Sequence, residues 1–99
     1  MIYEFIAGLL LAHMTADYPL QTNWMAENKH SDRYALTFHG VVHGLAAIVF
    51  VTPIHPGVAV GVAFPVAAIH ATIDSQNLSI RWDQTAHLLT AVFLGVLIA

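Results

Sequence analysis

Four long apolar runs fill most of this chain and constrain its fold more than any other feature of the sequence. They cover about residues 1–18, 35–51, 58–76 and 82–99. A membrane-spanning helix needs about 17–25 apolar residues, so each run is long enough for one crossing. The sequence therefore predicts an all-α protein, an integral membrane four-helix bundle that forms a single transmembrane domain over residues 1–99.

The composition excludes most other classes of protein. Apolar residues make up 58% of the chain and charged residues 9%, whereas about a quarter of a soluble domain is charged. A disordered chain would be more polar, and no nucleic-acid partner is expected because the net charge is -3 without a Lys/Arg cluster. The chain has no cysteine, which excludes a disulfide scaffold and a thiolate metal site. The predicted partner of its surface is the lipid bilayer.

The few basic residues predict how the bundle is oriented. Lys29 and Arg33 lie between the first two predicted helices, and Arg81 lies between the last two. Both segments fall at the same end of an up-down bundle, and the positive-inside rule places that end in the cytoplasm. Both chain termini are then expected on the outer side, in a cell inner membrane or a viral membrane.

The segment from Gln21 to Tyr34 is the longest polar stretch of the chain. Its residues 22–27 are predicted to form either a short interfacial helix or a plain loop. In both cases Trp24 and Tyr34 would lie at the level of the lipid headgroups, where aromatic side chains are enriched.

Each predicted helix carries one pair of potential metal ligands, spaced four residues apart. The pairs are His13 and Asp17, His39 and His43, His70 and Asp74, and Asp83 and His87. Residues with this spacing share one helix face, so all four pairs can point at a common axis. An ionisable side chain costs about 2.5–3.5 kcal/mol at mid-depth in a membrane, which favours a function for so many of them. We predict a metal centre near the cytoplasmic face, formed by these eight side chains; a purely structural polar network is the alternative.

The positions of these ligands along the helices predict two layers. The deeper layer comprises His13, His43, His70 and His87, and the outer layer comprises His39, Asp17, Asp74 and Asp83. Eight ligands exceed the needs of one tetrahedral ion and suit two divalent ions, whose charge would also offset the three carboxylates. Imidazole and carboxylate ligands favour zinc, iron or manganese, and the lack of sulfur ligands disfavours copper(I).

The two halves of the chain share a short motif. Residues 13–17 and 70–74 both read H-x-T-x-D, and each segment is followed by an aromatic residue joined to a second ligand pair. This similarity favours two pseudo-repeated helical hairpins over a chance match of five positions. The hairpins are expected to be related by an axis along the membrane normal.

Two G-x3-G motifs lie in or beside the second and third runs. They comprise Gly40 with Gly44, and Gly57 with Gly61. Because small residues let helix backbones approach closely, both motifs predict helix packing rather than a binding site.

The combined motifs resemble those of an uncharacterised family of bacterial and viral polytopic membrane proteins, known as domain of unknown function 3307. The pattern reads H-x3-D-[FY]-x-L-Q, a downstream Lys, H-x3-H, H-x3-D and D-Q-x2-H. In this chain it comprises His13, Asp17, Tyr18, Leu20, Gln21, Lys29, His39, His43, His70, Asp74, Asp83, Gln84 and His87. The resemblance covers nearly the whole chain and implies a membrane protein with a metal site and no established substrate. Ser75 follows Asp74 here, where the family often carries a Lys.

Three further polar residues, Gln21, Lys29 and Gln84, lie near the expected mouth of the site. They are candidates for holding the ligands in place or for contacting substrate, with solvated interfacial groups as the alternative. His30 and His55 lie in loops and are not expected to be ligands.

The first functional hypothesis is a metal-dependent membrane hydrolase acting on a lipid-like or amphiphilic substrate, with a diiron oxygenase as a subtype. A metal pair would activate water and polarise a phosphoryl or carbonyl oxygen. Asp83 is the candidate catalytic residue, a general base at the first turn of its helix, and Asp17 is the second candidate. An N-terminal capping role is the alternative for Asp83.

Non-catalytic roles are the alternatives to the hydrolase hypothesis. The eight groups would bind or pass metal ions or protons, or they would only lock the helices together in a structural subunit of a larger membrane assembly. Haem ligation is less favoured because carboxylates accompany the histidines. The outer halves of the helices, such as residues 88–99, are almost wholly apolar, which disfavours a transport path across the membrane.

Overall fold

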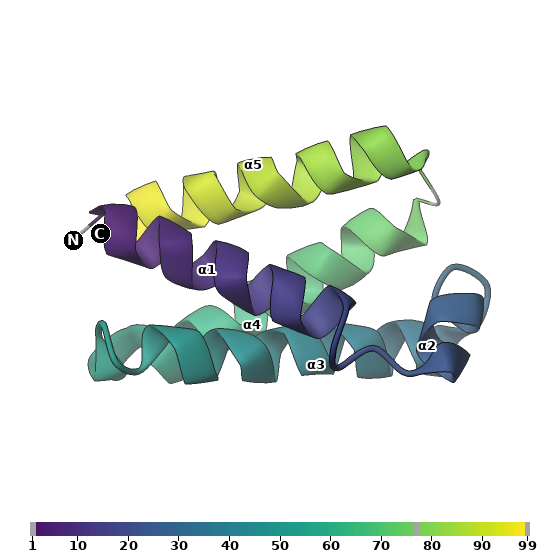
Figure 1. Ribbon diagram of the computed structural model, residues 1–99, viewed down its shortest axis with the longest axis horizontal. Helices are drawn as coiled ribbons and strands as arrows, with labels where there is room; N and C mark the ends of the chain where they lie inside the picture. The colour runs from purple at the N-terminus through teal and green to yellow at the C-terminus, as the bar shows by residue number, and fades with distance from the viewer. Residues whose placement is uncertain (1, 77, 99) are drawn as a thin grey trace.

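The computed structural model describes residues 2–76 and 78–98, and within these residues it contains helices and their connections but no strand. The long helices are α1 (Ile2–Asp17), α3 (Arg33–Val51), α4 (Pro56–Ser75) and α5 (Ile80–Ile98), and the short helix α2 (Asn23–Asn28) lies between α1 and α3 (Figure 1). The all-α prediction is confirmed. The long helices lie in the four predicted runs, with their described ends within about two residues of the expected positions.

Local interactions explain where several helices begin. Thr22 accepts a hydrogen bond from the backbone N–H of Met25 at 3.1 Å, so α2 forms in place of the alternative plain loop. Asp32 caps α3 in the same way, accepting from the N–H of Tyr34 at 2.8 Å, and α3 therefore begins before its apolar run. Pro56 begins α4, where its missing N–H leaves no donor unsatisfied.

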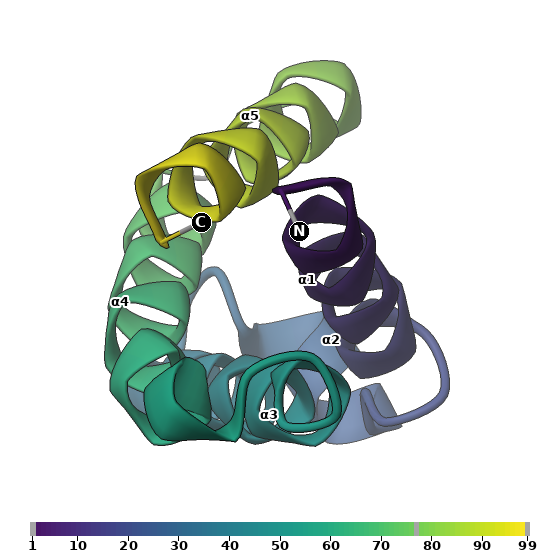
Figure 2. The same cartoon turned by 90° about the vertical axis from the view of Figure 1, so that its left-hand side faces the viewer.

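The four long helices form an up-down ring, with α2 at one end (Figures 1 and 2). Around the ring the order is α1, α3, α4, α5 and back to α1, and each helix contacts its two neighbours. The α1–α3 and α4–α5 connections lie at the end that carries α2, and the α3–α4 connection lies at the other end. Lys29, Arg33 and Arg81 therefore share one end, as their positions in the sequence predicted.

The apolar core lies toward the end of the ring opposite to α2. Its largest members are Phe5, Leu9, Val51, Val62 and Leu94. The other buried members of this core are alanines, whose small side chains let the helices approach closely. The ring therefore has an apolar interior at one end, and its polar interior lies at the other end.

The exterior of the ring is unlike that of a water-soluble protein. Large apolar side chains project outward from all four long helices, for example Tyr3 at 82% exposure, Phe64 at 73% and Leu97 at 69%. Eight polar or charged side chains are instead buried inside the ring, each at most 8% exposed. A soluble monomer rarely exposes so much apolar surface. Such an exterior is typical of a protein whose surface contacts lipid or another protein.

Two of the long helices, α3 and α4, are long and apolar enough to cross a membrane. The expectation of four such helices is thus met only in part within the described residues. The 16 residues of α1 give a length of about 24 Å, against a hydrocarbon core of about 30 Å. The first half of α5 carries Arg81, Asp83, Gln84 and His87, and these polar residues lower its hydropathy.

The first G-x3-G motif packs two helices together and the second does not. A Cβ atom at Gly40 would lie 3.1 Å from the carbonyl oxygen of Ala67, and one at Gly44 would lie 3.0 Å from that of Ala63. The backbones of α3 and α4 therefore approach closely there, as predicted. A Cβ atom at Gly61 would meet nothing within 4 Å, so the prediction for the second motif is wrong. Its spacing places two glycines on one face of α4, but that face does not meet a neighbouring helix.

Candidate metal centre

Eight buried polar side chains from the four long helices meet at the end of the ring that carries α2. They are the eight predicted ligands, and we call them the ligand cluster. The cluster comprises His13, Asp17, His39, His43, His70, Asp74, Asp83 and His87. Each pair with a four-residue spacing lies on the inner face of its helix, because apolar side chains occupy the outer faces. The structure thus brings all eight residues together.

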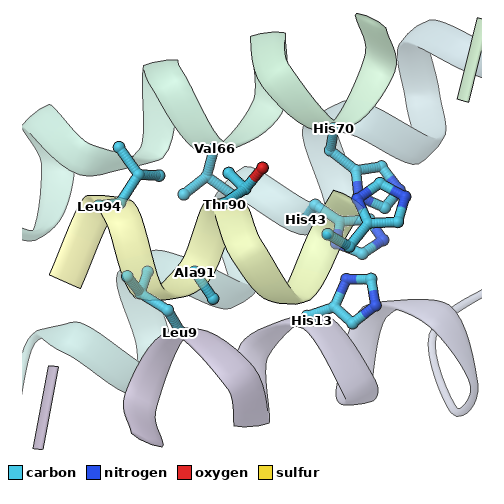
Figure 3. Close-up of a pocket in the computed structure, with 9 residues that line it drawn as sticks. Leu9, His13, His43, Val66, His70, Thr90, Ala91 and Leu94 are labelled. Carbon is cyan, nitrogen blue, oxygen red and sulfur yellow. The ribbon is translucent and has the colours of Figure 1, made fainter. Parts of the chain in front are cut away.

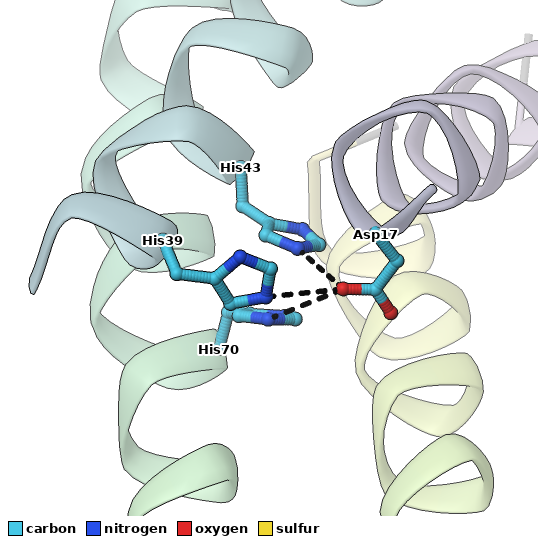
Figure 4. A group of neighbouring side chains, drawn as sticks. All are labelled: Asp17, His39, His43 and His70. Carbon is cyan, nitrogen blue, oxygen red and sulfur yellow. Dashed lines mark hydrogen bonds and ion pairs between the residues drawn. The ribbon is translucent and has the colours of Figure 1, made fainter. Parts of the chain in front are cut away.

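Asp17, at the end of α1, contacts histidines of α3 and α4 (Figure 4) and one of its own helix. Its Oδ1 lies 2.9 Å from Nε2 of His43 and 3.1 Å from Nε2 of His39, both on α3. The same oxygen lies 3.9 Å from Nε2 of His70 on α4. Its Oδ2 lies 3.2 Å from Nε2 of His13, one turn earlier on α1.

Asp74, near the end of α4, has a similar set of neighbours. Its Oδ1 lies 3.1 Å from Nε2 of His87 on α5, and its Oδ2 lies 3.0 Å from Nε2 of His70. Its Oδ2 also lies 3.4 Å from Nε2 of His39, so Asp74 links the two halves of the cluster. Asp83, the third carboxylate, places Oδ2 3.4 Å from Nε2 of His87. Within the described residues, only histidines form ion pairs with these carboxylates.

All five histidines of the ligand cluster turn Nε2, the same ring nitrogen, toward carboxylates. Three groups of side chains offer ligand atoms that lie within 4.8 Å of one another. These groups are Asp17, His39, His43 and His70; His13, His70 and His87; and Asp74, Asp83 and His87. In a tetrahedral site with metal–ligand bonds of about 2.0–2.1 Å, the ligand atoms lie about 3.3 Å apart. The spacing within the cluster therefore suits metal ions.

Several buried atoms of the cluster lack a hydrogen-bond partner in the described part of the chain. They include His70 Nε2, Asp74 Oδ2 and Asp83 Oδ1. The first two atoms lie 3.0 Å apart, but their approach does not have the geometry of a hydrogen bond. An unsatisfied polar atom costs about 1–3 kcal/mol when buried. A cation bound between these atoms would satisfy them, so the donor set fits a metal ion.

The four histidines predicted for the deeper layer border a small cavity (Figure 3). Its volume is about 30 Å³, which is enough for a water molecule, and Leu9, Val66 and Leu94 contribute to its apolar walls. None of the four residues predicted for the outer layer lines it. The cavity therefore lies on the apolar side of the cluster, and the two predicted layers are present.

The imidazole rings of the deeper layer are closely stacked. The ring centroids of His43 and His70 lie 3.3 Å apart, and those of His70 and His87 lie 4.0 Å apart. Protonated imidazoles would repel one another strongly at these distances, whereas neutral imidazole is the form that binds metal. The stacking therefore favours the form of histidine that a metal centre needs.

Two of the predicted residues at the mouth of the site contact the ligand cluster. The Oε1 atom of Gln84 lies 3.2 Å from Nε2 of His13, and its Nε2 donates to Oδ2 of Asp83 at 3.3 Å. Gln21 Nε2 donates to the backbone carbonyl of Asp17 at 3.1 Å. Both glutamines are thus placed to hold ligand-bearing residues in position.

The segment that follows α2 reaches across the mouth of the site to α4. His30 Nδ1 donates to the backbone carbonyl of Asp74 at 2.8 Å, and Lys29, one position earlier, is the C-cap residue of α2. Sequence reasoning missed this contact of His30, because the two residues are 44 positions apart and no motif links them. His55 lies at the opposite end of the ring, where it precedes α4.

Asp83 lies inside the ligand cluster rather than at its open edge. Only 7% of the residue is exposed, although the start of α5 was expected to lie close to the membrane interface. Its Oδ2 contacts Gln84 and His87 of the same helix, and Gln84 in turn contacts His13 of α1. Its role as a general base stays a prediction.

The chain was compared with known protein families, curated proteins and solved structures. The profile of a family described as a protein of unknown function (DUF3307) matches residues 5–98. The chain belongs to this family. All eight residues of the ligand cluster lie inside the matched region, and the family membership that the sequence indicated is thereby confirmed. No curated protein and no solved structure matches the chain.

Proposed function

We propose that the chain is an integral membrane protein in which all four long helices cross the bilayer and the ligand cluster faces the cytoplasm. The apolar exterior supports this proposal, as do the length and hydropathy of α3 and α4. The position of Lys29, Arg33 and Arg81 at the ligand end supports the orientation. Local thinning of the bilayer would accommodate the short α1.

Reporter fusions test the orientation. Alkaline phosphatase fused to either end of the chain is expected to be active, because it would lie outside the cytoplasm. A fluorescent protein inserted after Ser79, in the α4–α5 connection, is expected to fluoresce as the matched cytoplasmic control. Terminal fusions that are active only as cytoplasmic reporters would contradict the orientation.

We further propose that the ligand cluster binds two divalent ions, with zinc, iron and manganese as the candidates. The observation that carries this proposal is the convergence of five Nε2 atoms and three carboxylates in one buried cluster. Buried carboxylates are costly unless they are paired, and no Lys or Arg pairs with these three within the described residues. Two divalent ions would supply the missing positive charge.

The proposed activity is hydrolysis of a lipid-like or amphiphilic substrate at the cytoplasmic interface. A bound divalent ion would supply an activated water and would polarise a phosphoryl or carbonyl group. Asp83 is the proposed base: its Oδ2 faces His87, while its Oδ1 is buried without a hydrogen-bond partner in the described residues. One carboxylate can thus bind an ion through one oxygen and accept a proton on the other. Lys29 and Gln84 are placed to contact an anionic headgroup.

The substitution Asp83→Asn tests this role. The amide oxygen still binds an ion, so the variant is expected to keep most of its metal while turnover falls by about 100-fold or more, the usual contribution of a general base. Bis-p-nitrophenyl phosphate and a p-nitrophenyl fatty ester, both presented in detergent micelles, are suitable probes. Unchanged turnover with either probe would contradict the base role, as would complete loss of metal. His55→Asn is the matched control at the opposite end.

A non-catalytic role in metal binding or membrane assembly is the second candidate. One observation favours it: several Nε2–carboxylate distances, such as 2.9 Å for His43 and Asp17, suit direct hydrogen bonds without an ion. A structural subunit of this kind would show no turnover in the metal-loaded protein, and its helix packing would survive removal of metal. Turnover of the metal-loaded protein separates hydrolysis from non-catalytic metal binding. Thermal unfolding of the chelator-treated protein separates both from a metal-free network, because only a metal-dependent cluster is expected to lose stability.

A further inference from the structure

The two halves of the ligand cluster follow the hairpin repeat that the H-x-T-x-D motif predicts. The first hairpin comprises α1 and α3, and the second comprises α4 and α5. Around the ring the order is α1, α3, α4, α5, so half a turn of the ring takes α1 to α4 and α3 to α5. Under this pairing four positions of the first hairpin correspond to four of the second. The corresponding positions are His13 and His70, Asp17 and Asp74, His39 and Asp83, and His43 and His87.

Contacts within the two halves repeat closely. In the first half, Oδ1 of Asp17 lies 2.9 Å from Nε2 of His43; in the second, Oδ1 of Asp74 lies 3.1 Å from Nε2 of His87. The aspartate also contacts the histidine one turn earlier on its own helix, at 3.2 Å for Asp17 and 3.0 Å for Asp74. Side chains as well as helices are therefore repeated.

The repeat is broken at a single ligand position. The first half carries His39, which is fully buried. Its Nε2 lies 3.1 Å from Oδ1 of Asp17 and 3.4 Å from Oδ2 of Asp74. The second half carries Asp83 at the corresponding position, with Oδ2 3.4 Å from His87 and with Oδ1 unpartnered in the described residues. The first half thus gains an imidazole where the second gains a carboxylate.

On the basis of the proposed metal centre, we infer that the two ions occupy chemically different positions. The first, the imidazole-rich position, lies among Asp17, His39, His43 and His70; the second, the carboxylate-rich position, lies among Asp74, Asp83 and His87 and is approached by His13. One carboxylate leaves a divalent ion in the first position with a net positive charge, whereas two carboxylates neutralise it in the second.

Ligand chemistry then assigns different ions to the two positions. Imidazole favours zinc, iron and other transition metals, whereas carboxylate oxygen favours manganese and magnesium. The imidazole-rich position is therefore a tight zinc-type or iron-type site. The carboxylate-rich position exchanges its ion more readily and accepts manganese.

Titration of the chelator-stripped, full-length protein in detergent micelles with Co²⁺ tests the inference. Visible absorption distinguishes ligand environments and reports binding without any assay of activity. Two successive steps with different spectra are expected, separated by about tenfold or more in affinity. Two ions that bind in one step with one spectrum would overturn the inference and leave the proposed metal centre intact. No Co²⁺ binding would overturn the metal centre itself.

A pair of exchanges at the broken position sharpens the test. Asp83→His gives both halves the same ligand types, so the two Co²⁺ steps are expected to merge to within about threefold and the spectra to converge. His39→Asp is expected to weaken the first step and leave the second nearly unchanged. His55→Asp, far from the cluster, is the matched control for each. Unchanged titration of the Asp83→His variant would overturn the inference; if a variant fails to fold, the wild-type titration still decides it.

Discussion

The two ends of the helical ring have opposite interiors. At the end that carries α2, the space between the helices holds three carboxylates and five imidazoles. At the other end the same helices enclose Phe5, Leu9, Val51, Val62 and Leu94. The apolar end is held by close packing of its side chains, whereas the ligand end is stable only when its charges are offset. We infer from this difference that the apolar end maintains the fold and that the ligand end carries the proposed metal centre.

Removing the carboxylates that contact most of the histidines is expected to have the largest effect. The double substitution Asp17→Asn with Asp74→Asn removes the two residues that contact all five histidines of the cluster. We expect metal content near that of the buffer, measured by elemental analysis, because two anionic ligands are lost at once. Helix content measured by circular dichroism is expected to persist, since the apolar end is unchanged.

The matched control for the double substitution is His55→Gln. His55 is a histidine of the opposite end and belongs to none of the candidate ligand groups in the described residues. The metal content of the His55→Gln variant is expected to equal that of the wild type. Equal loss of metal in both variants would contradict the assignment of function to one end.

A large-to-small substitution in the apolar end is expected to lower the stability of the fold and to leave metal binding unchanged. Phe5 is 1% exposed, and Phe5→Ala is expected to cost about 3–5 kcal/mol of unfolding free energy by creating a cavity. Unfolding by a denaturing detergent measures this cost, and the metal content of the folded fraction is expected to stay unchanged. Phe64→Ala, at a position with 73% exposure, is the control and is expected to cost far less. A lower metal content in folded Phe5→Ala protein would show that the two ends are not independent.

The smallest effects are expected at two glycines of neighbouring helices. Gly44→Ala would place a Cβ atom 3.0 Å from the carbonyl oxygen of Ala63 and is expected to cost about 1–3 kcal/mol. Gly61→Ala meets nothing within 4 Å and is expected to be neutral or to stabilise its helix by about 0.5–1 kcal/mol. The same unfolding assay compares them. Equal costs would contradict the close approach of α3 and α4.

Much of the fold and of the ligand cluster could be predicted from the sequence, because both depend on local spacing. Apolar run lengths locate the long helices, and a four-residue spacing places both members of each ligand pair on one helix face. The duplicated H-x-T-x-D motif predicts that the two hairpins carry corresponding ligands. The ring order of the helices agrees with that expectation.

The features that escaped prediction depend on tertiary contacts. The hydrogen bond from His30 to the carbonyl of Asp74 joins segments that only the folded ring brings together. The burial of Asp83 belongs to a part of α5 that meets α1, where neighbouring Gln84 contacts His13, 71 positions away in the sequence. The spacing of Gly57 and Gly61 could not reveal which face of α4 meets a neighbour.

The central claim is that the ligand cluster holds metal, and elemental analysis tests it most directly. The full-length protein should be purified in detergent without exposure to chelator and compared with its own dialysis buffer. We expect about two divalent ions per chain, because eight potential ligands exceed the needs of one tetrahedral ion. A metal content indistinguishable from that of the buffer would contradict the claim and leave the cluster as a hydrogen-bonded network that packs the helices.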